Sequence, residues 1–141
     1  MYFADDAILV TNPEISSCRD SDKMIGFIAS KSLRAIEGRV PVNQRLLINR
    51  YDANRVRNED CLSVEDIEEM LGLPVCGVIP ESPHVLTSSN MGQPVITAEG
   101  ENAAVAFEDA VARFLGEERA MKFLQPKPAK SLFGSLFSKS T

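Results

Sequence analysis

The chain is 141 residues long, a length that suits one domain with one hydrophobic core. Its composition, with 44% hydrophobic and 25% charged residues, is that of an ordinary globular protein. The formal net charge of -5 excludes the strongly basic surface that is typical of nucleic-acid binding proteins, so we expect no nucleic-acid partner. The segment from Glu117 onwards is basic, however, which suggests that the body and the tail have separate roles.

The cysteines and the histidine give no sign of a catalytic or metal site. Cys18, Cys61 and Cys76 are scattered without CxxC spacing, which fits free thiols in a reducing cytoplasm. His84 is the only histidine and has no partner pattern, so we expect it on the surface or in packing. No run approaches the roughly 18 apolar residues of a membrane-spanning helix. The first residues lack the basic region of a signal peptide.

Three short apolar runs, at residues 7–11, 45–49 and 75–80, predict strands. The first run, AILVT, is apolar on both faces, which is typical of a buried parallel strand. Helical patterns separate the three runs. Strands that alternate with helices indicate an α/β fold with a mostly parallel sheet flanked by helices.

The first helix is expected to begin at Ser16 or Ser17, run to about Glu37 and end at Gly38. Its apolar side chains recur at near-helical spacing, which predicts one continuous helix with one buried face. The residues of that face are Met24, Ile25, Ile28, Leu33 and Ile36.

Two further helices have clear boundaries. Ser63 with Asp66 predicts the capped start of a short helix that ends at Gly72. The last helix of the body is expected at residues 102–115, closed by Gly116. Its apolar side is predicted to consist of Val105, Val111, Phe114 and Leu115.

Three strands form a very small sheet for so apolar a first strand. A central parallel strand needs neighbours on both edges and cover on both faces, and the sequence provides the first strand with one neighbour. We infer that the chain is part of a larger α/β domain whose N-terminal half is missing. The alternative is a small complete α/β domain with a short sheet.

The C-terminal segment has the pattern of a short interfacial helix. Pro126 and Pro128 prevent a continuous helix through residues 125–129. Beyond them, four large apolar residues at i, i+1, i+4 and i+5 form one stripe, with lysines at both ends. The alternatives are a tail that docks on the body and a disordered tail without a role. The residues predicted to contact membrane are Leu132, Phe133, Leu136, Phe137, Lys130 and Lys139.

Several stretches resemble a known family: YFADDAILVTNPEISSCRDSDKMIGFIASKS, EDIEEMLGLPVCGVIPES, SNMGQPVI and RFLGEER. They resemble the septum-site-determining ATPases of the bacterial MinD family, deviant P-loop ATPases of the MinD/ParA group. The resemblance implies residues 1–116 as the C-terminal part of a P-loop ATPase domain, residues 117–129 as a linker and residues 130–139 as a membrane-targeting amphipathic helix.

The same resemblance implies a function and partners. Family members bind ATP with Mg, form homodimers and associate with the cytoplasmic face of the inner membrane. They recruit a MinC-like inhibitor of septum formation and respond to a MinE-like activator of hydrolysis. The chain departs from the family in one decisive respect, because it contains no GxxxxGK[ST] motif to hold phosphates. We therefore expect no productive ATP binding and no ATPase activity from this chain alone.

Two sets of candidate site residues follow from the resemblance. Positions after the later strands line the adenine pocket in the family. For Asn49 and Arg50, the alternative to a base-binding role is an ordinary polar pair at the end of a strand. Glu14 and the RDSD stretch are expected near the dimer and partner-binding face, and a solvated start of a helix is their alternative. The base-binding residues are Asn49, Arg50, Pro80 and Glu81, and the partner-face residues are Glu14, Arg19, Asp20 and Asp22.

Two other functions remain open from the sequence. One is a non-enzymatic membrane-binding or partner-binding module that has lost the ATPase half. The other is a fragment of a related P-loop ATPase that sets flagellar number. The amphipathic tail and the RDSD stretch argue against a chromosome-partitioning relative.

Overall fold

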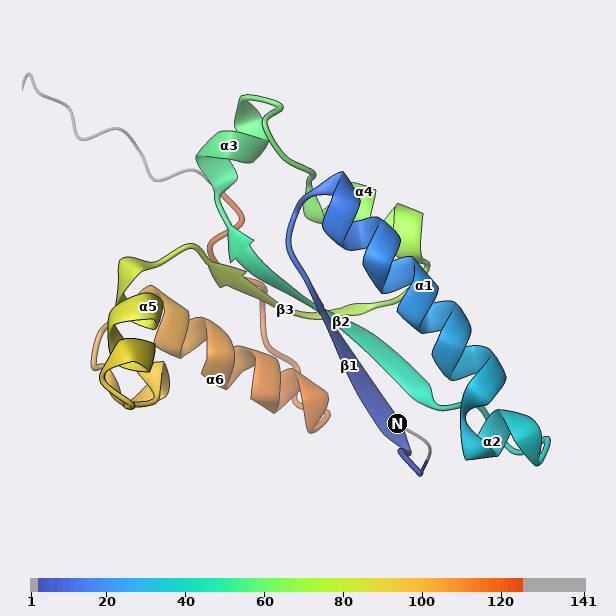
Figure 1. Ribbon diagram of the computed structural model, residues 1–141. Helices are drawn as coiled ribbons and strands as arrows, with labels where there is room; N and C mark the ends of the chain where they lie inside the picture. The colour runs from blue at the N-terminus through green and yellow to red at the C-terminus, as the bar shows by residue number, and fades with distance from the viewer. Residues whose placement is uncertain (1–2, 126–141) are drawn as a thin grey trace, which may run out of the picture.

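The computed structural model describes residues 3–125, which form a three-stranded parallel sheet with helices on both faces (Figure 1). The strands are β1 (Asp6–Thr11), β2 (Asn43–Tyr51) and β3 (Val75–Pro80), in the order β1-β2-β3. The helices are α1 (Ile15–Lys31), α2 (Leu33–Ile36), α3 (Ala53–Arg57), α4 (Val64–Leu71), α5 (Pro83–Asn90) and α6 (Asn102–Phe114), with a 3-10 turn, η1 (Val95–Thr97). The predicted α/β class and the parallel sheet are confirmed.

The two faces of the sheet are covered by different helices. α1 and α4 lie on one face, and α5 and α6 lie on the other (Figure 1). Leu46 and Ile48 of β2 are fully buried in the core under α1 and α4. Ile79 of β3 packs with Ala103 and Ala106 of α6 in a second, smaller core. Because side chains alternate along a strand, β3 supplies both cores, with Val78 in the first and Ile79 in the second.

The boundaries of α4 are as predicted. The Ser63 hydroxyl accepts a hydrogen bond from the Asp66 backbone N–H at 3.0 Å, and the Asp66 carboxylate accepts one from the Ser63 backbone N–H at 3.0 Å. The hydrogen bonds from Ser63 lower the pKa of Asp66. Gly72 ends the helix with a φ of 62°, a conformation that a residue without a side chain adopts easily.

The single helix expected up to about Glu37 is divided in two, and that prediction is wrong. α1 ends at Lys31 because Ser32 leaves the helical conformation, with ψ of 154°. The Ser32 hydroxyl then accepts a hydrogen bond from the Ala35 N–H and begins α2. A serine side chain competes in this way with helical backbone hydrogen bonds. The predicted serine caps at the start of α1 are also wrong, because the N-cap is Glu14 and its side chain makes no capping bond.

The face of α6 that packs on the sheet differs from the predicted apolar side. Val111 and Leu115 are 54% and 72% exposed, whereas the buried positions are mostly alanines. The small side chains allow close packing, since a Cβ added at Gly77 of β3 would lie 2.5 Å from Cβ of Ala110. The close approach of helix and sheet therefore favours alanine over the larger apolar residues at this interface.

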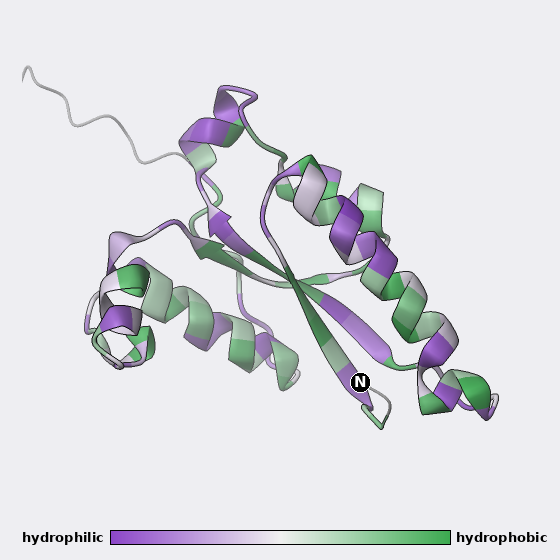
Figure 2. Ribbon diagram, viewed as in Figure 1, coloured by the Kyte–Doolittle hydropathy of each residue, from purple (hydrophilic) through white to green (hydrophobic). Residues whose placement is uncertain are grey.

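β1 lies at an open edge of the sheet although its sequence is that of a central strand. It pairs with β2 alone, and its middle is hydrophobic (Figure 2). Leu9 is buried under α1, but Ile8 is 44% exposed and Val10 is 57% exposed on the opposite face. The sequence-based expectation that this strand lacks a neighbour is met by the structure. No helix within residues 3–125 is long and apolar enough to cross a membrane.

Candidate functional site

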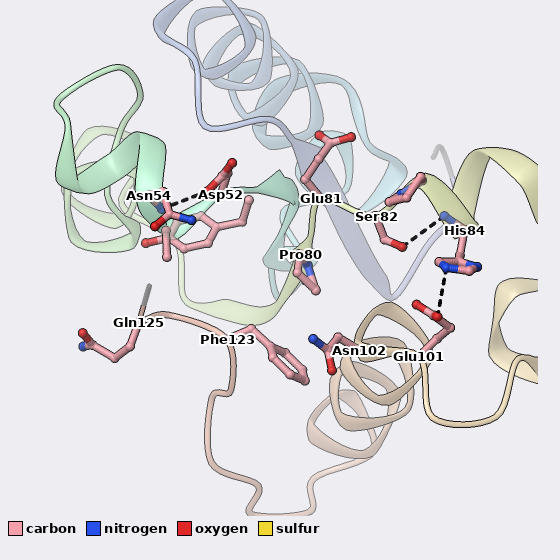
Figure 3. Close-up of a pocket in the computed structure, with 13 residues that line it drawn as sticks. Asp52, Asn54, Pro80, Glu81, Ser82, His84, Glu101, Asn102, Phe123 and Gln125 are labelled. Carbon is pink, nitrogen blue, oxygen red and sulfur yellow. Dashed lines mark hydrogen bonds and ion pairs between the residues drawn. The ribbon is translucent and has the colours of Figure 1, made fainter. Parts of the chain in front are cut away.

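A pocket of about 480 Å³ lies at the carboxyl ends of β2 and β3 (Figure 3). Open α/β sheets bind their ligands at this end of the strands, and the volume falls in the range of small-molecule sites. Four segments contribute to the lining, from the end of β2 to the segment after α6. The lining residues are Tyr51, Asp52, Ala53, Asn54, Pro80, Glu81, Ser82, Pro83, His84, Glu101, Asn102, Phe123 and Gln125.

The side of the pocket formed by β2 is shaped by a capped helix. Tyr51 ends β2 and is buried, and burial raises the pKa of its phenol. The next residue, Asp52, is the N-cap of α3, and its carboxylate accepts a hydrogen bond from the Asn54 N–H at 2.8 Å. The Glu81 N–H donates to the Tyr51 carbonyl at 2.9 Å, so the ends of β2 and β3 are held together.

The side formed by β3 repeats the same arrangement. Ser82 is the N-cap of α5 and accepts a hydrogen bond from the His84 N–H at 3.1 Å. Pro83 is the first helical residue, where its fixed φ favours the helix. The His84 ring nitrogen Nε2 lies 3.1 Å from Glu101 Oε1, so the start of α5 is linked to the residue before α6 (Figure 3). The isolated His84 gave no sign of this role in the sequence.

The remaining wall of the pocket combines an aromatic ring with amides. Phe123 and Asn102 lie beneath Pro80, and Gln125 lies on the opposite side of the view, below Asn54 (Figure 3). Asn and Gln side chains can both donate and accept hydrogen bonds, and an aromatic ring offers a face for stacking. These are the groups that a flat heteroaromatic ring requires.

The structure brings two of the four predicted base-binding residues to this pocket. Pro80 and Glu81 line it, whereas Asn49 is half-buried within β2 and Arg50 lies outside. Arg50 Nε donates to Glu81 Oε2 at 2.9 Å, and this contact raises the pKa of the guanidinium. Arg50 also has a φ of 57°, a conformation uncommon outside glycine. The roles assigned to these four residues stay predictions.

The predicted partner-face residues are together on the exposed side of α1. Glu14 is the N-cap, and Arg19, Asp20 and Asp22 are exposed. Asp20 and Asp22 lie beyond the first turn of α1 and not, as was expected, at the start of the helix, because α1 already begins at Ile15. The Lys23 ammonium lies 2.8 Å from Asp20 Oδ1 and lowers the pKa of that carboxyl. The predicted membrane-contacting residues, from Lys130 to Lys139, lie outside the described residues.

The described residues fit part of a nucleotide and not its metal. The pocket suits a base, and the sequence has no GxxxxGK[ST] loop for phosphates. Within residues 3–125, no three His, Cys, Asp or Glu side chains are grouped so that they could hold a metal ion. We therefore assign none of these described residues to Mg.

No model of a known protein family matches the chain. It is 48% identical over 137 residues to the septum site-determining protein MinD of Escherichia coli K12, an alignment that covers 95% of this chain and 51% of the relative. It is 50% identical over 137 residues to the MinD protein of Neisseria meningitidis serogroup B, with 97% and 50% covered. The chain thus spans about half the length of the curated relatives that it matches.

Solved structures agree with the sequence relatives. The MinD cell division protein of Aquifex aeolicus superimposes with a TM-score of 0.75 at 34% identity, covering 86% of this chain and 48% of that chain. A MinC:MinD complex from Aquifex aeolicus gives 0.73 at 36% identity, with 85% and 46% covered. MinD of Pyrococcus horikoshii complexed with Mg-ADP gives 0.59 at 29% identity, with 79% and 43% covered.

The parallel sheet, flanked by helices and carrying a pocket at its carboxyl edge, places the chain in the α/β class of P-loop ATPase folds. Within that class, sequence identity of about one half to MinD proteins, along nearly the whole chain, identifies the family. The chain belongs to the MinD family and corresponds to the C-terminal half of its members.

Proposed function

We propose that this chain supplies the base-binding part of a MinD-type ATPase that associates with membrane and helps to set the division site. The pocket at the carboxyl ends of β2 and β3 is the observation that carries the proposal, since it joins an aromatic ring to amide groups in about 480 Å³. The solved MinD structure with Mg-ADP supports a purine nucleotide as its ligand.

Phosphate binding and hydrolysis require a second polypeptide segment in this proposal. β1 presents a free edge and the exposed Ile8 and Val10, which a further parallel strand and its helix would cover. The relatives are about twice as long as the aligned region. The chain alone binds a base weakly and does not hydrolyse ATP, because it lacks the loop that orients the γ-phosphate.

The remaining functions concern partners. The exposed acids Asp20 and Asp22 on α1, with Glu14 and Arg19, form a surface that contacts a MinC-like inhibitor or a second copy in a homodimer. The MinC:MinD complex supports the first of these partners. The other two proposed partners are a MinE-like activator and the cytoplasmic face of the inner membrane. The chain binds the membrane through residues 130–139.

Reconstitution tests the proposal. The purified chain is mixed with the complementary N-terminal half of Neisseria meningitidis MinD, and phosphate release from ATP is measured for each piece and for the mixture. We expect hydrolysis from the mixture alone, and none when the Lys of the phosphate-binding loop in the added half is replaced by Ala. Dose-dependent phosphate release from the 141-residue chain by itself would overturn the proposal, as would an inactive mixture that forms a stable complex.

A further inference from the structure

Residues 117–125, here called the strap, return along the outer edge of β3 after α6 ends. Gly116 makes the turn with a φ of 94°. The Arg113 guanidinium then joins three backbone carbonyls: Nη1 donates to Cys76 of β3 at 2.7 Å, Nε to Arg119 at 2.8 Å and Nη2 to Ala120 at 2.9 Å. One side chain of α6 thus ties the strap to the strand that it follows.

A buried carboxylate fixes the strap a second time. Asp109 of α6 is 2% exposed, and its two oxygens lie 3.3 Å from Arg119 Nη1 and 2.7 Å from Lys122 Nζ. The Lys122 ammonium and the Asp109 carboxylate form an ion pair. Both cations belong to the strap, so a single carboxylate holds it at two points.

Apolar side chains of the strap reach both faces of the sheet. Met121 and Leu124 pack against the core under α1 and α4, and Phe123 packs with Ile79 in the core under α6. Phe123 has a φ of 65°, which is unusual for an aromatic residue. This backbone conformation accompanies the placement of the ring on the pocket wall beside Asn102 (Figure 3).

We propose that the strap is the base-reading wall of the pocket, with Phe123 stacking on a purine and Gln125 bonding to its edge. The inference rests on the proposed function, because it names residues of the same site. Asp109 and Arg113 are positioning residues in this scheme, since they hold the strap and do not reach the pocket. A ligand that contacts the strap also stabilises its seated position, so occupancy of the pocket and seating of the strap favour each other.

The test uses adenosine, which carries no phosphate and so reports on the base alone. Its dissociation constant is measured by NMR titration of the 15N-labelled 141-residue chain, together with amide exchange in residues 117–125. Phe123→Leu removes the ring and should weaken adenosine binding about tenfold, as expected for a lost base–aromatic stack. The matched control is Phe107→Leu, because Phe107 belongs to the same apolar cluster and does not line the pocket.

Adenosine should slow amide exchange in the strap of the wild-type chain and of Phe107→Leu, and much less in Phe123→Leu. Gln125→Ala is a second variant for the case that Phe123→Leu fails to fold. Gln125 is exposed, so its replacement should leave the fold intact while it weakens adenosine binding. If adenosine binds the wild type and the folded strap variants equally, the strap inference is overturned and the base pocket stands. If the wild-type chain does not bind adenosine at all, the inference and the proposed function both fail.

Discussion

Ala110 of α6 and Gly77 of β3 are in such close contact that β3 has no space for a side chain at position 77. A Cβ there would lie 2.5 Å from Cβ of Ala110 and 2.7 Å from Cδ1 of Leu47. The contact sets the distance between α6 and the sheet. α6 continues from this contact to Phe114, and the strap that follows it carries Phe123 to the pocket.

Gly77→Ala is therefore expected to destabilise the fold by about 1–3 kcal/mol, the usual effect of overpacking a close contact. Urea unfolding followed by circular dichroism measures the free energy of unfolding. Gly26→Ala is the matched control, since nothing lies within 4 Å of a Cβ at Gly26 in α1. The control should gain about 0.5–1 kcal/mol from the helix preference of alanine. Equal stability of the two variants would contradict the close contact.

Asp109→Asn should loosen the strap and destabilise the chain by about 1–3 kcal/mol, because it removes the charge that pairs with Lys122 and leaves Arg119 with Glu117 alone. Lys122, and then Arg119, lower the pKa of Asp109 in the folded state. A lowered pKa stabilises the fold above the ordinary value of about 3.9, and this contribution is lost as pH falls through the folded-state pKa.

The difference in unfolding free energy between wild type and Asp109→Asn should thus be constant near neutral pH and shrink below about pH 4. Asp20→Asn serves as the control, because the exposed Asp20–Lys23 pair contributes little to stability. A difference that stays unchanged down to acid unfolding would show that the Asp109 ion pairs do not hold the strap.

Ser63→Ala removes one half of the reciprocal capping at the start of α4 and should cost about 1 kcal/mol. Ser16→Ala is the comparison, since Ser16 lies inside α1 and caps nothing. Thermal unfolding of both variants gives the answer. A larger loss for Ser16→Ala would favour the serine cap predicted from sequence over the start that the structure describes.

Phe133→Glu or Phe137→Glu should reduce binding to vesicles of phosphatidylethanolamine and phosphatidylglycerol more than tenfold, because each removes about 1.5–3 kcal/mol of apolar burial. Ser138→Glu adds the same charge to the polar side of the predicted helix and should have a much smaller effect. Sedimentation over a range of lipid concentrations measures the affinity. If both phenylalanine variants bind like the wild type, the hypothesis of a tail without a membrane role becomes the better one.

Features with a local cause could be predicted from the sequence. The apolar runs identified all three strands, and the spacing of Ser63 and Asp66 identified the start of α4. The break at Ser32 also has a local cause, a hydroxyl that bonds to the Ala35 N–H, but the same residue occurs inside many helices. Pattern alone does not distinguish the two cases.

Features that depend on distant parts of the chain could not be predicted. The alanine face of α6 follows from Gly77, which lies on another element. Phe123 lies at the pocket on a strap that Arg113 connects to Cys76 of β3 and that Asp109 holds through Arg119 and Lys122. Pro80 and Glu81 were named from the family resemblance, which implies base-binding residues after the later strands, and both line the pocket at the carboxyl end of β3.

Amide exchange in β1 tests most directly whether this sheet is one part of a larger one. The 141-residue chain is measured alone and after addition of the complementary half of Neisseria meningitidis MinD, with β2 as the internal control because it is paired on both edges. We expect the amides of β1 that do not bond to β2 to exchange rapidly in the chain alone and at least about tenfold more slowly in the mixture. Slow exchange throughout β1 in a monomeric chain, unchanged by the added half, would contradict the claim that this sheet is one part of a larger one.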